Sequence, residues 1–214
     1  MRFLITAGPT REPIDPVRYL SNRSSGKMGY AIADAALEAG HDVTLISGPV
    51  NLPPPAAAKL IAVMTSDEMG GAVHQHVGQC DILVMCAAVA DYKPARVSAE
   101  KIKKRNAPLS LELVPTRDIL GSLAAPDRQF LVVGFAAETS DIEQHARQKL
   151  RDKNCDIIVA NDVAVGMEGD ENEVTVFFRS GESRKIARAS KKNIGRELVK
   201  IFSNSCEKRL TKNV

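Results

Sequence analysis

Short apolar runs, each bounded by turn residues, recur along the chain and constrain its fold more than any other feature. Continuous runs of this kind are typical of strands that are buried on both faces of a sheet. The runs are Phe3–Ala7, Val43–Ile46, Leu60–Val63, Ile82–Met85, Leu131–Phe135 and Ile157–Ala160. They predict a parallel sheet of about six strands.

Helical patterns lie between these runs. One apolar helical face consists of Met28, Ile32, Ala35, Ala36 and Ala39. Capping boxes at Thr65–Glu68 and Ser140–Glu143 predict that two further helices begin there, because their side chains satisfy the first free backbone amides. Strands that alternate with helices favour an α/β class of fold, a Rossmann-like doubly wound parallel sheet.

The C-terminal part departs from this alternation. Glu173–Phe178 and Ser183–Ala189, joined by a turn at Arg179–Gly181, predict an antiparallel hairpin extension. Apolar residues at helical spacing within Ile194–Phe202 predict a terminal helix, and the polar residues from Glu207 onward predict that its end frays. The 214 residues contain no linker-like segment, so we expect one domain over residues 1–214.

Composition excludes several classes of protein. The chain is 44% hydrophobic and 26% charged, which is ordinary for a folded soluble protein. No apolar run reaches the roughly 20 residues of a membrane span, and Met1 leads directly into a strand-like run without a secretory leader. The four cysteines lack CxxC spacing, so we expect reduced thiols and a cytoplasmic location. The 29 Lys and Arg barely exceed the 26 Asp and Glu, which argues against a nucleic-acid-binding protein.

The segment after the first predicted strand is a candidate anion site, because open parallel sheets bind ligands beyond the carboxyl ends of their strands. A long loop leads from Gly8 to Ser24, Ser25 and Gly26, which open the following helix just before Gly29. Backbone amides and hydroxyls at a helix N-terminus bind anions, so we expect a phosphate site. The alternative is that the two helix glycines only allow close packing against the sheet.

Two familiar nucleotide motifs do not fit this segment. A dinucleotide fingerprint places its glycines directly after the strand and an acidic residue about 20 residues later. Here the loop is longer and the second strand ends at Ser47 and Gly48. A P-loop places Ser or Thr after its Gly-Lys pair, but Met28 follows Lys27. The sequence argues against a Walker-type NTPase and leaves an NAD(P)-binding reductase as a weaker alternative.

Two further segments suggest a bound nucleotide. The small residues of Cys86–Asp91 would let a planar base approach the backbone while Asp91 accepts hydrogen bonds, although plain packing under a helix is the alternative. The basic run Lys101–Arg105 is suited to close over a triphosphate, and its alternatives are a solvated face or a nucleic-acid contact. Aromatic residues make up only 4% of the chain, which argues against a stacking platform for single strands.

Lysines and potential metal ligands elsewhere are less distinctive. Lys149 and Lys153 lie one helical turn apart and project from the same face, toward an anion or toward solvent. His74, His76 and Cys80 share no helix face and have no second ligand pair nearby, which argues against zinc. No Ser-His-Asp arrangement is evident, so nucleophilic catalysis has no support in the sequence.

Distinctive motifs follow most of the predicted strands. They are Gly8–Glu12, Asp15–Asn22, Ser24–Gly29, Ala87–Tyr92, Lys101–Lys104, Val133–Thr139 and Ala160–Asp162. Together they closely resemble the motifs of the phosphopantothenate–cysteine ligases, or phosphopantothenoylcysteine synthetases. The resemblance spans nearly the whole chain and implies a homodimer that acts in coenzyme A biosynthesis. In many bacteria this domain is fused behind a flavin-dependent decarboxylase, and nothing in this chain resembles that flavoprotein.

The resemblance implies a reaction in two steps. The carboxylate of 4'-phosphopantothenate attacks the α-phosphate of CTP, which gives an acyl-cytidylate and pyrophosphate, and Mg²⁺ accompanies the CTP. The amine of L-cysteine then displaces CMP to form an amide. Activation is necessary because oxide cannot leave a carboxylate, whereas CMP leaves readily. The protein therefore supplies positioning and charge neutralisation.

The resemblance also implies roles for individual residues. The candidate catalytic residues are Asn22, which holds the acyl-cytidylate, Arg18, which supports it, and Lys101, which meets the triphosphate. The other nucleotide contacts are Cys86, Ala87, Ala88, Asp91, Arg117, Asp118, Ile119, Leu120, Phe135, Lys149 and Lys153. The substrate phosphate is held by Ser24, Gly26, Gly29 and Asn161. Arg117 departs from the pattern, because the family usually has proline at that place, and no protein ligand of the metal is implied.

Overall fold

The computed structural model describes residues 1–104, 106–125, 127–138, 141–162 and 169–212. Its main strands are β1 (Arg2–Ala7), β4 (Asp42–Ser47), β5 (Lys59–Ala62), β6 (Ile82–Met85), β9 (Leu131–Glu138), β10 (Ile157–Asp162), β11 (Glu171–Phe178) and β12 (Ser183–Ser190). Its helices are α1 (Lys27–Glu38), α2 (Ser66–His76), α3 (Ile142–Asp152) and α5 (Lys191–Lys212), with short 3-10 turns η1 (Val77–Gln79) and η2 (Gly121–Leu123). No helix among these is long and apolar enough to cross a membrane.

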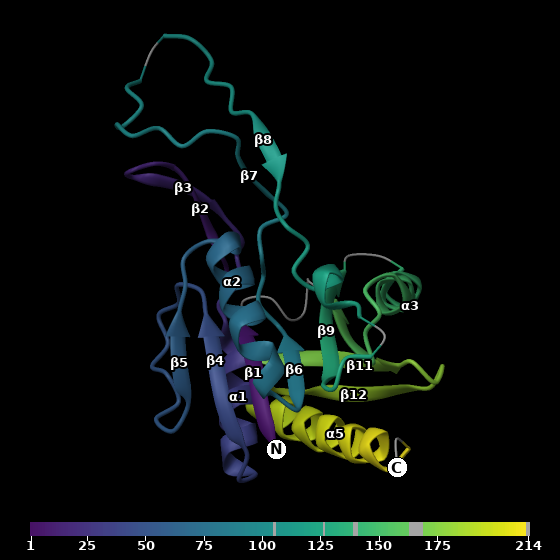
Figure 1. The fold of residues 1–214 in the computed structure, drawn as a ribbon. Coiled ribbons are helices and arrows are strands. Elements are labelled where there is room, and N and C mark those ends of the chain that lie inside the picture. The colour runs from purple at the N-terminus through teal and green to yellow at the C-terminus, as the bar shows by residue number, and fades with distance from the viewer. Residues whose placement is uncertain (105, 126, 139–140, 163–168, 213–214) are drawn as a thin grey trace.

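One sheet of 8 strands forms the centre of the molecule, in the order β12-β11-β10-β9-β6-β1-β4-β5 (Figure 1). The strands from β10 to β5 run parallel to one another. The hairpin of β11 and β12 continues the same sheet, because β11 pairs antiparallel with β10. The predicted α/β class, the parallel strands and the hairpin extension are confirmed.

Helices cover both faces of the sheet (Figure 1). Residues of α1 and α5 pack on one face, against Phe3 and Ile5 of β1, and residues of α2 and α3 pack in the cluster on the other face, which includes Leu4. Neighbouring residues of β1 therefore enter opposite cores, and Leu4 and Ile5 are each at most 1% exposed. Burial on both faces explains why the strand has a continuous apolar run.

Only one of the two predicted capping boxes can be described in full. The Thr65 hydroxyl accepts a hydrogen bond from the Glu68 amide at 3.2 Å, and the Glu68 carboxylate accepts one from the Thr65 amide at 3.4 Å. Ser140 lies outside the described residues. The helix that follows it begins at Ile142, and its N-cap residue Asp141 makes no side-chain cap.

The first and last helices pack closely on each other. Gly195 of α5 lies so near α1 that an added Cβ would be 2.7 Å from the carbonyl oxygen of Ala31. A residue with a side chain would force the two helices apart at this point.

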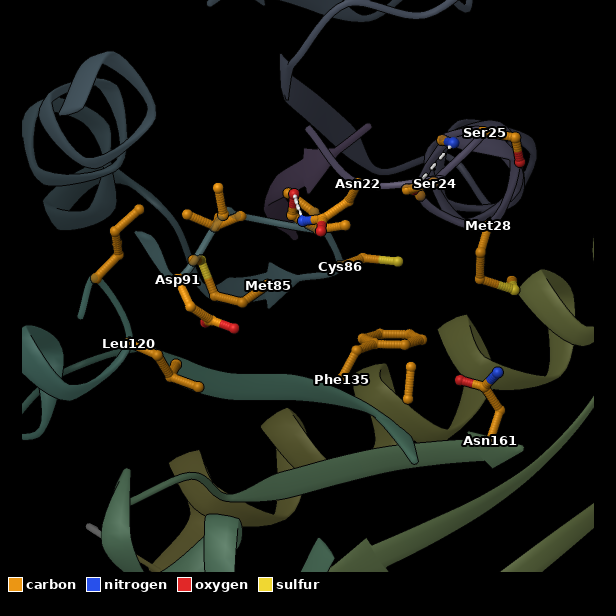
Figure 2. A pocket seen from close by; sticks show the side chains of 18 of the residues that line it. Asn22, Ser24, Ser25, Met28, Met85, Cys86, Asp91, Leu120, Phe135 and Asn161 are labelled. Atoms are coloured by element: carbon orange, nitrogen blue, oxygen red, sulfur yellow. Dashed lines mark hydrogen bonds between the residues drawn. The ribbon is translucent and has the colours of Figure 1, made fainter. Parts of the chain in front are cut away.

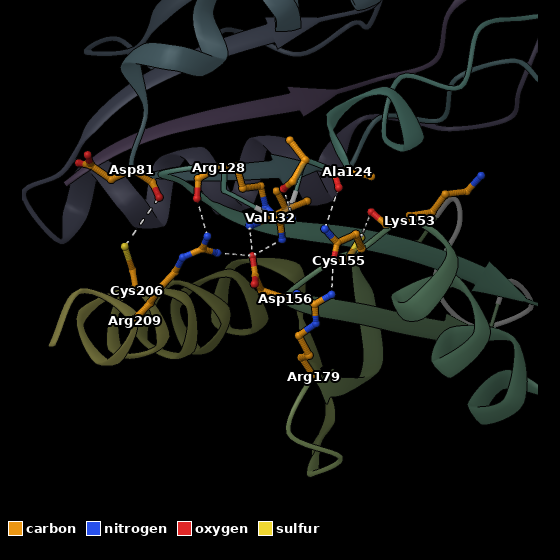
Figure 3. Close-up of polar contacts among 12 residues, drawn as sticks. Asp81, Ala124, Arg128, Val132, Lys153, Cys155, Asp156, Arg179, Cys206 and Arg209 are labelled. Atoms are coloured by element: carbon orange, nitrogen blue, oxygen red, sulfur yellow. Dashed lines mark hydrogen bonds and ion pairs between the residues drawn. The ribbon is translucent and has the colours of Figure 1, made fainter. Parts of the chain in front are cut away.

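An ion-pair network around Asp156 holds the other end of α5 (Figure 3). Asp156 Oδ2 accepts hydrogen bonds from Arg209 at 2.9 Å and from the buried Arg128 at 2.8 Å. The Val132 amide donates to the same oxygen at 2.8 Å. The expectation that the helix frays from Glu207 is wrong, because these contacts hold Arg209 and the helix continues.

Two β-ribbons lie outside the main sheet. β2 (Arg11–Asp15) pairs with β3 (Arg18–Ser21), and β7 (Tyr92–Pro94) pairs with β8 (Leu113–Pro115), both antiparallel. They project beyond the carboxyl ends of the parallel strands, and the loop between β7 and β8 extends farthest (Figure 1). We call Arg11–Ser21 the hairpin and Tyr92–Pro115 the arm. The sequence patterns predicted loops in both places.

Asp15 joins the arm to the hairpin. Its carboxylate accepts hydrogen bonds from the Ile102 amide at 3.1 Å and from the Arg18 amide at 2.9 Å and Nε at 3.0 Å. Arg18 Nη2 also donates to the Ile102 carbonyl at 2.9 Å. Asp15 is only 3% exposed. The hydrogen bonds with Arg18 outweigh this burial and hold the pKa of Asp15 well below its ordinary range.

Candidate active site

A pocket of about 560 Å³ opens at the carboxyl ends of the central strands. The chain runs from β1 outward to β4 and β5, and then returns to place β6 on the opposite side of β1. Ligands of open α/β sheets bind at this point of reversal. The pocket is lined by the start of α1, by the segment after β6, by residues 116–120 and by parts of β9, β10 and α3.

The segment after β6 is held beside the segment after β1. The Ala88 amide donates to the Gly8 carbonyl at 2.9 Å, and the Thr10 amide donates to the Ala88 carbonyl at 3.2 Å. Asn22 Nδ2 donates to the same Ala88 carbonyl at 2.9 Å. The structure thus brings Asn22 against the small residues that the sequence pattern assigns to the nucleotide.

The pocket is elongated, with different chemistry at its two ends. In Figure 2, Asp91 and Leu120 lie at one end, Met28 and Asn161 lie at the other, and the ring of Phe135 lies between them. We call these the nucleotide end and the helix end. The predicted nucleotide contacts and the predicted phosphate contacts thus lie toward opposite ends of a single pocket.

Two lysines at the C-terminal end of α3 reach the pocket lining: Lys149 lies within the helix and Lys153 is its C-cap residue. Lys149 Nζ donates to the Phe135 carbonyl at 2.7 Å, and Lys153 forms an ion pair with Asp118. Burial opposes the ionisation of Asp118, but the Lys153 ammonium and the Gly121 amide at 2.9 Å outweigh it, so the pKa of Asp118 lies below its ordinary value. Both lysines line the pocket, and the interpretation that they face an anion rather than solvent stays a prediction.

The helix end is formed by the N-terminus of α1. Gly26 is the N-cap residue with a φ of 76°, no side chain caps the helix, and no acidic residue lies in its first turn. The Gly26 amide donates to the Ser24 hydroxyl at 3.3 Å, but the amides that follow it in the first turn have no side-chain acceptor and present partial positive charge. Gly29 packs on β1, where an added Cβ would be 2.6 Å from the Cβ of Ala7. The packing alternative thus accounts for Gly29, while both glycines still line the pocket.

The thiol of Cys86 in the pocket lining is held in its protonated, weakly nucleophilic form. Burial raises the pKa of the Cys86 thiol to about 12, so the group is protonated at neutral pH. Among the residues that the structure describes, no three or more His, Cys, Asp or Glu side chains form a potential metal site. His74 instead contacts the Ser122 hydroxyl at 2.9 Å.

The structure brings nearly all of the predicted site residues to this pocket. The exceptions are Arg18 and Lys101, which do not belong to its lining. Arg18 contacts Asp15 and Ile102 at the base of the arm, and Lys101 precedes Ile102 on the arm. Arg105 of the basic run and Thr139 of a family motif lie outside the described residues.

Three polar residues of the helix end were not predicted. They are Lys27, Asn172 and Lys191. In the sequence, Lys27 belongs to the failed P-loop match and to the family motif Ser24–Gly29, but neither assigns it a role of its own. Lys191 stands beside Lys192 at the start of a helix, a pattern that is typical of solvated residues, and no local signal marks it as buried.

Comparison with known proteins identifies the family. The sequence model of one protein family, the DNA/pantothenate metabolism flavoprotein C-terminal domain, matches residues 1–205. The coenzyme A biosynthesis bifunctional protein CoaBC of Escherichia coli is 51% identical over 189 residues, which are 85% of this chain and 47% of that protein. CoaBC of Bacillus subtilis is 48% identical over 200 residues, which are 92% of this chain and 49% of that protein. The chain spans about half the length of these curated relatives.

Solved structures agree with this result. The C-terminal domain of a CoaBC protein superposes with a TM-score of 0.84 at 42% identity, covering 97% of this chain and 96% of that one. A complex of Cab2 with phosphopantothenate-cysteine superposes with a TM-score of 0.82 at 16% identity, covering 99% of this chain and 88% of that one. This second likeness shows the fold alone. The chain therefore belongs to the family of the DNA/pantothenate metabolism flavoprotein C-terminal domain, and the resemblance carried by its strand-end motifs is confirmed.

Proposed function

We propose that this chain is a CTP-dependent phosphopantothenate–cysteine ligase of coenzyme A biosynthesis. The observation that carries the proposal is one pocket lined by two groups of cations, Arg117, Lys149 and Lys153 in one and Lys27 and Lys191 in the other, together with small residues and the ring of Phe135. Such a pocket fits two phosphate-bearing ligands that react with each other between its ends. The names of the CoaBC relatives, and the phosphopantothenate-cysteine held by the Cab2 structure, support this choice of substrates.

In the first step, CTP occupies the nucleotide end. The base lies against the small residues after β6, where Asp91 accepts hydrogen bonds from its donors. Lys149 and Lys153 balance phosphate charge, and the substrate carboxylate attacks the α-phosphorus from the helix end. The bond to the β-phosphate breaks with its electron pair, and pyrophosphate leaves. The product is the acyl-cytidylate.

In the second step, the amine of cysteine attacks the acyl carbon, CMP leaves, and the amine loses a proton. Negative charge grows on the acyl oxygen during this attack. Asn22 has two amide N–H donors, of which one is bound to Ala88 at 2.9 Å. The other is available to stabilise that charge. The protonated thiol of Cys86 agrees with activation through the nucleotide rather than through an acyl-enzyme.

The residues of the pocket fit a magnesium ion that arrives with the triphosphate. Mg²⁺ in nucleotide enzymes uses phosphate oxygens, water and one or two carboxylates, not a dedicated protein cage. Asp91 and Asp118 are the carboxylates among the described lining residues. Because Asp91 is assigned to the base, Asp118 is the one that would hold the ion or its water ligands. Bound there, the ion would neutralise charge on the phosphates.

We further propose that the arm brings Lys101 to the triphosphate and that the protein is a cytoplasmic homodimer. The hairpin and arm expose large apolar side chains that lack a core of their own. These are Val17, Tyr19, Tyr92, Val97, Leu109, Leu111 and Leu113. Such a surface is suited to be covered by a second copy of the chain. A parent protein with a flavin-dependent decarboxylase domain agrees with the bifunctional relatives.

The proposal is tested by measuring pyrophosphate release from CTP, ATP, GTP and UTP with 4'-phosphopantothenate, with and without cysteine. We expect release from CTP in both cases, limited to one equivalent when cysteine is absent. Release that does not depend on 4'-phosphopantothenate, or no release from any nucleotide, would contradict the ligase assignment. Release from ATP in preference to CTP would contradict only the choice of nucleotide.

A further inference from the structure

The helix end contains a buried lysine that the reaction described above does not use. Lys191, the first residue of α5, is only 5% exposed and lines the pocket. Its ammonium forms no hydrogen bond or ion pair with any residue that the structure describes. Burial, followed by the nearby charge of Lys27, lowers its pKa below the ordinary lysine value. A buried cation without a partner is costly, and an anion in the pocket would remove that cost.

The neighbouring lysine differs in this respect. Lys27 Nζ contacts Asp170 Oδ1 at 2.6 Å, so its charge already has a carboxylate partner. The carbonyl of Asp170 accepts a hydrogen bond from the Lys191 amide at 2.9 Å. Asp170 thus fixes the backbone of Lys191, and its carboxylate forms an ion pair with Lys27. The same carboxylate raises the pKa of Lys191, but by less than burial and Lys27 lower it. The Lys191 ammonium therefore has no ion pair among the described residues and can take one from a ligand.

The groups around Lys191 are also donors. The N-terminus of α1 has no side-chain cap, and neither α1 nor α5 has an acidic residue in its first turn. Asn172 is 3% exposed, and its Oδ1 accepts from the Glu173 amide at 2.9 Å. Its Nδ2 donates to none of the described residues. A tetrahedral dianion, with several acceptor oxygens, matches this set of donors.

We propose that Lys191 binds the terminal phosphate of 4'-phosphopantothenate and makes the enzyme select the phosphorylated substrate. This inference rests on the proposed function and adds a specificity-determining residue to it. A phosphate monoester is largely a dianion at pH 7.5, since its second pKa is about 6. Pantothenate without the phosphate leaves the buried ammonium unpaired and is therefore rejected.

The test compares Lys191→Gln with Lys192→Gln by calorimetric titration of the full chain. Lys192 is the matched control, because it follows Lys191 directly but is exposed and pairs with Glu38 at 3.3 Å. We expect Lys191→Gln to weaken the binding of 4'-phosphopantothenate by about 10- to 100-fold. Binding of CTP to this variant, and binding of both ligands to Lys192→Gln, should stay within about twofold of the parent chain.

Three outcomes would overturn the inference. The first is unchanged binding of 4'-phosphopantothenate to Lys191→Gln. The second is a loss confined to CTP, which would assign the ammonium to the triphosphate. The third is that Lys191→Arg loses as much 4'-phosphopantothenate binding as Lys191→Gln and has a lowered melting temperature. Arginine keeps the positive charge, so it should retain most of the binding if that charge binds the phosphate.

Methyl phosphate separates this inference from the proposed function. If the parent chain binds methyl phosphate and Lys191→Gln does not, the anion site stands even where pyrophosphate release fails. If pyrophosphate is released but Lys191→Gln binds methyl phosphate and 4'-phosphopantothenate as the parent chain does, the ligase assignment stands and the role of Lys191 is rejected.

Discussion

The main sheet and the two ribbons beyond it differ in how far their apolar side chains are buried. Ile5 and Leu45 in the sheet are fully buried, whereas Leu109 and Leu113 on the arm are more than 40% exposed. The sheet is held by apolar burial on two faces, while the arm meets the hairpin through polar contacts: those of Asp15 and a backbone hydrogen bond from the Ser98 amide to the Ile14 carbonyl at 2.9 Å. Residues at the ends of the strands form the pocket, whereas Lys101 lies on the arm, outside the pocket lining. The two parts of the candidate site are thus held in place by different kinds of contact.

The largest expected difference is in stability. Phe3→Ala should lower the free energy of unfolding by about 3–5 kcal/mol, because it leaves a cavity in a closed core. Leu109→Ala should change it by no more than about 0.5 kcal/mol, because its side chain is exposed. Urea denaturation measures both values. Comparable losses in the two variants would show that the arm has a core of its own, for example in a dimer.

Enzyme activity, unlike stability, should be strongly affected by a substitution on the arm. Lys101→Gln should slow pyrophosphate release by about 10²- to 10³-fold, since a cation aimed at the departing phosphates is lost. The melting temperature should barely move. Lys103→Gln is the control on the same loop, and single-turnover assays give both rates. Near-normal rates in both variants would reduce the basic run to a solvated face.

Asn22, which lies next to the sheet, should affect the second step of the reaction. Asn22→Ala should slow amide formation from a preformed acyl-cytidylate by about 10²- to 10³-fold, because one donor to the developing oxyanion is removed. Affinity for CTP should change little, as measured by titration. Loss of CTP binding would make Asn22 a nucleotide ligand rather than a donor to the acyl oxygen.

A smaller effect is expected at the junction of arm and hairpin. Asp15→Asn removes the charge that holds Arg18 and the Ile102 amide, so the arm should dock less often and the first step should slow by about tenfold. Asp67→Asn is the control, because it removes an exposed ion pair between α2 and Lys93 of the arm, away from Ile102. Equal rates for the two variants would mean that docking does not limit the placement of Lys101.

The smallest effect is one of pH. A carboxylate whose pKa is lowered in the folded state stabilises that state above its unfolded pKa of about 3.9 and loses this contribution as the pH falls toward the folded value. The pKa of Asp15 is lowered by its bonds with Arg18. The arm should therefore stay docked from neutrality down to about pH 4, which the NMR shift of the Ile102 amide reports. A titration of that shift near pH 5 would contradict the buried contact.

Sequence patterns correctly predict those parts of this molecule in which a local apolar run is also buried in the core of the folded chain. Ile157–Ala160 forms a strand because every residue of the run enters a core. The ribbons carry no such signal, since Pro13 interrupts one of them and strand β7 is only 3 residues long. Leu109, Leu111 and Leu113 alternate as in a strand, but they face solvent within a single chain.

The same distinction applies to the site. Most lining residues follow strands, and the rule that ligands bind at strand ends brings them together without knowledge of packing. Lys191 could not be found in this way, because its burial depends on where α5 meets α1 at Gly195 and Ala31. The frayed end predicted beyond Glu207 failed for a similar reason, since the partner of Arg209 is Asp156, far away in sequence.

The close packing of α1 against α5 also affects how the chain reaches its native state. During synthesis, α1 leaves the ribosome well before α5, yet each forms part of the core that buries the other. Folds dominated by contacts between distant parts of the sequence fold slowly. Until α5 has been made, the apolar face of α1 lacks this partner and is open to chaperones and to aggregation. Completion of this core therefore awaits the synthesis of α5.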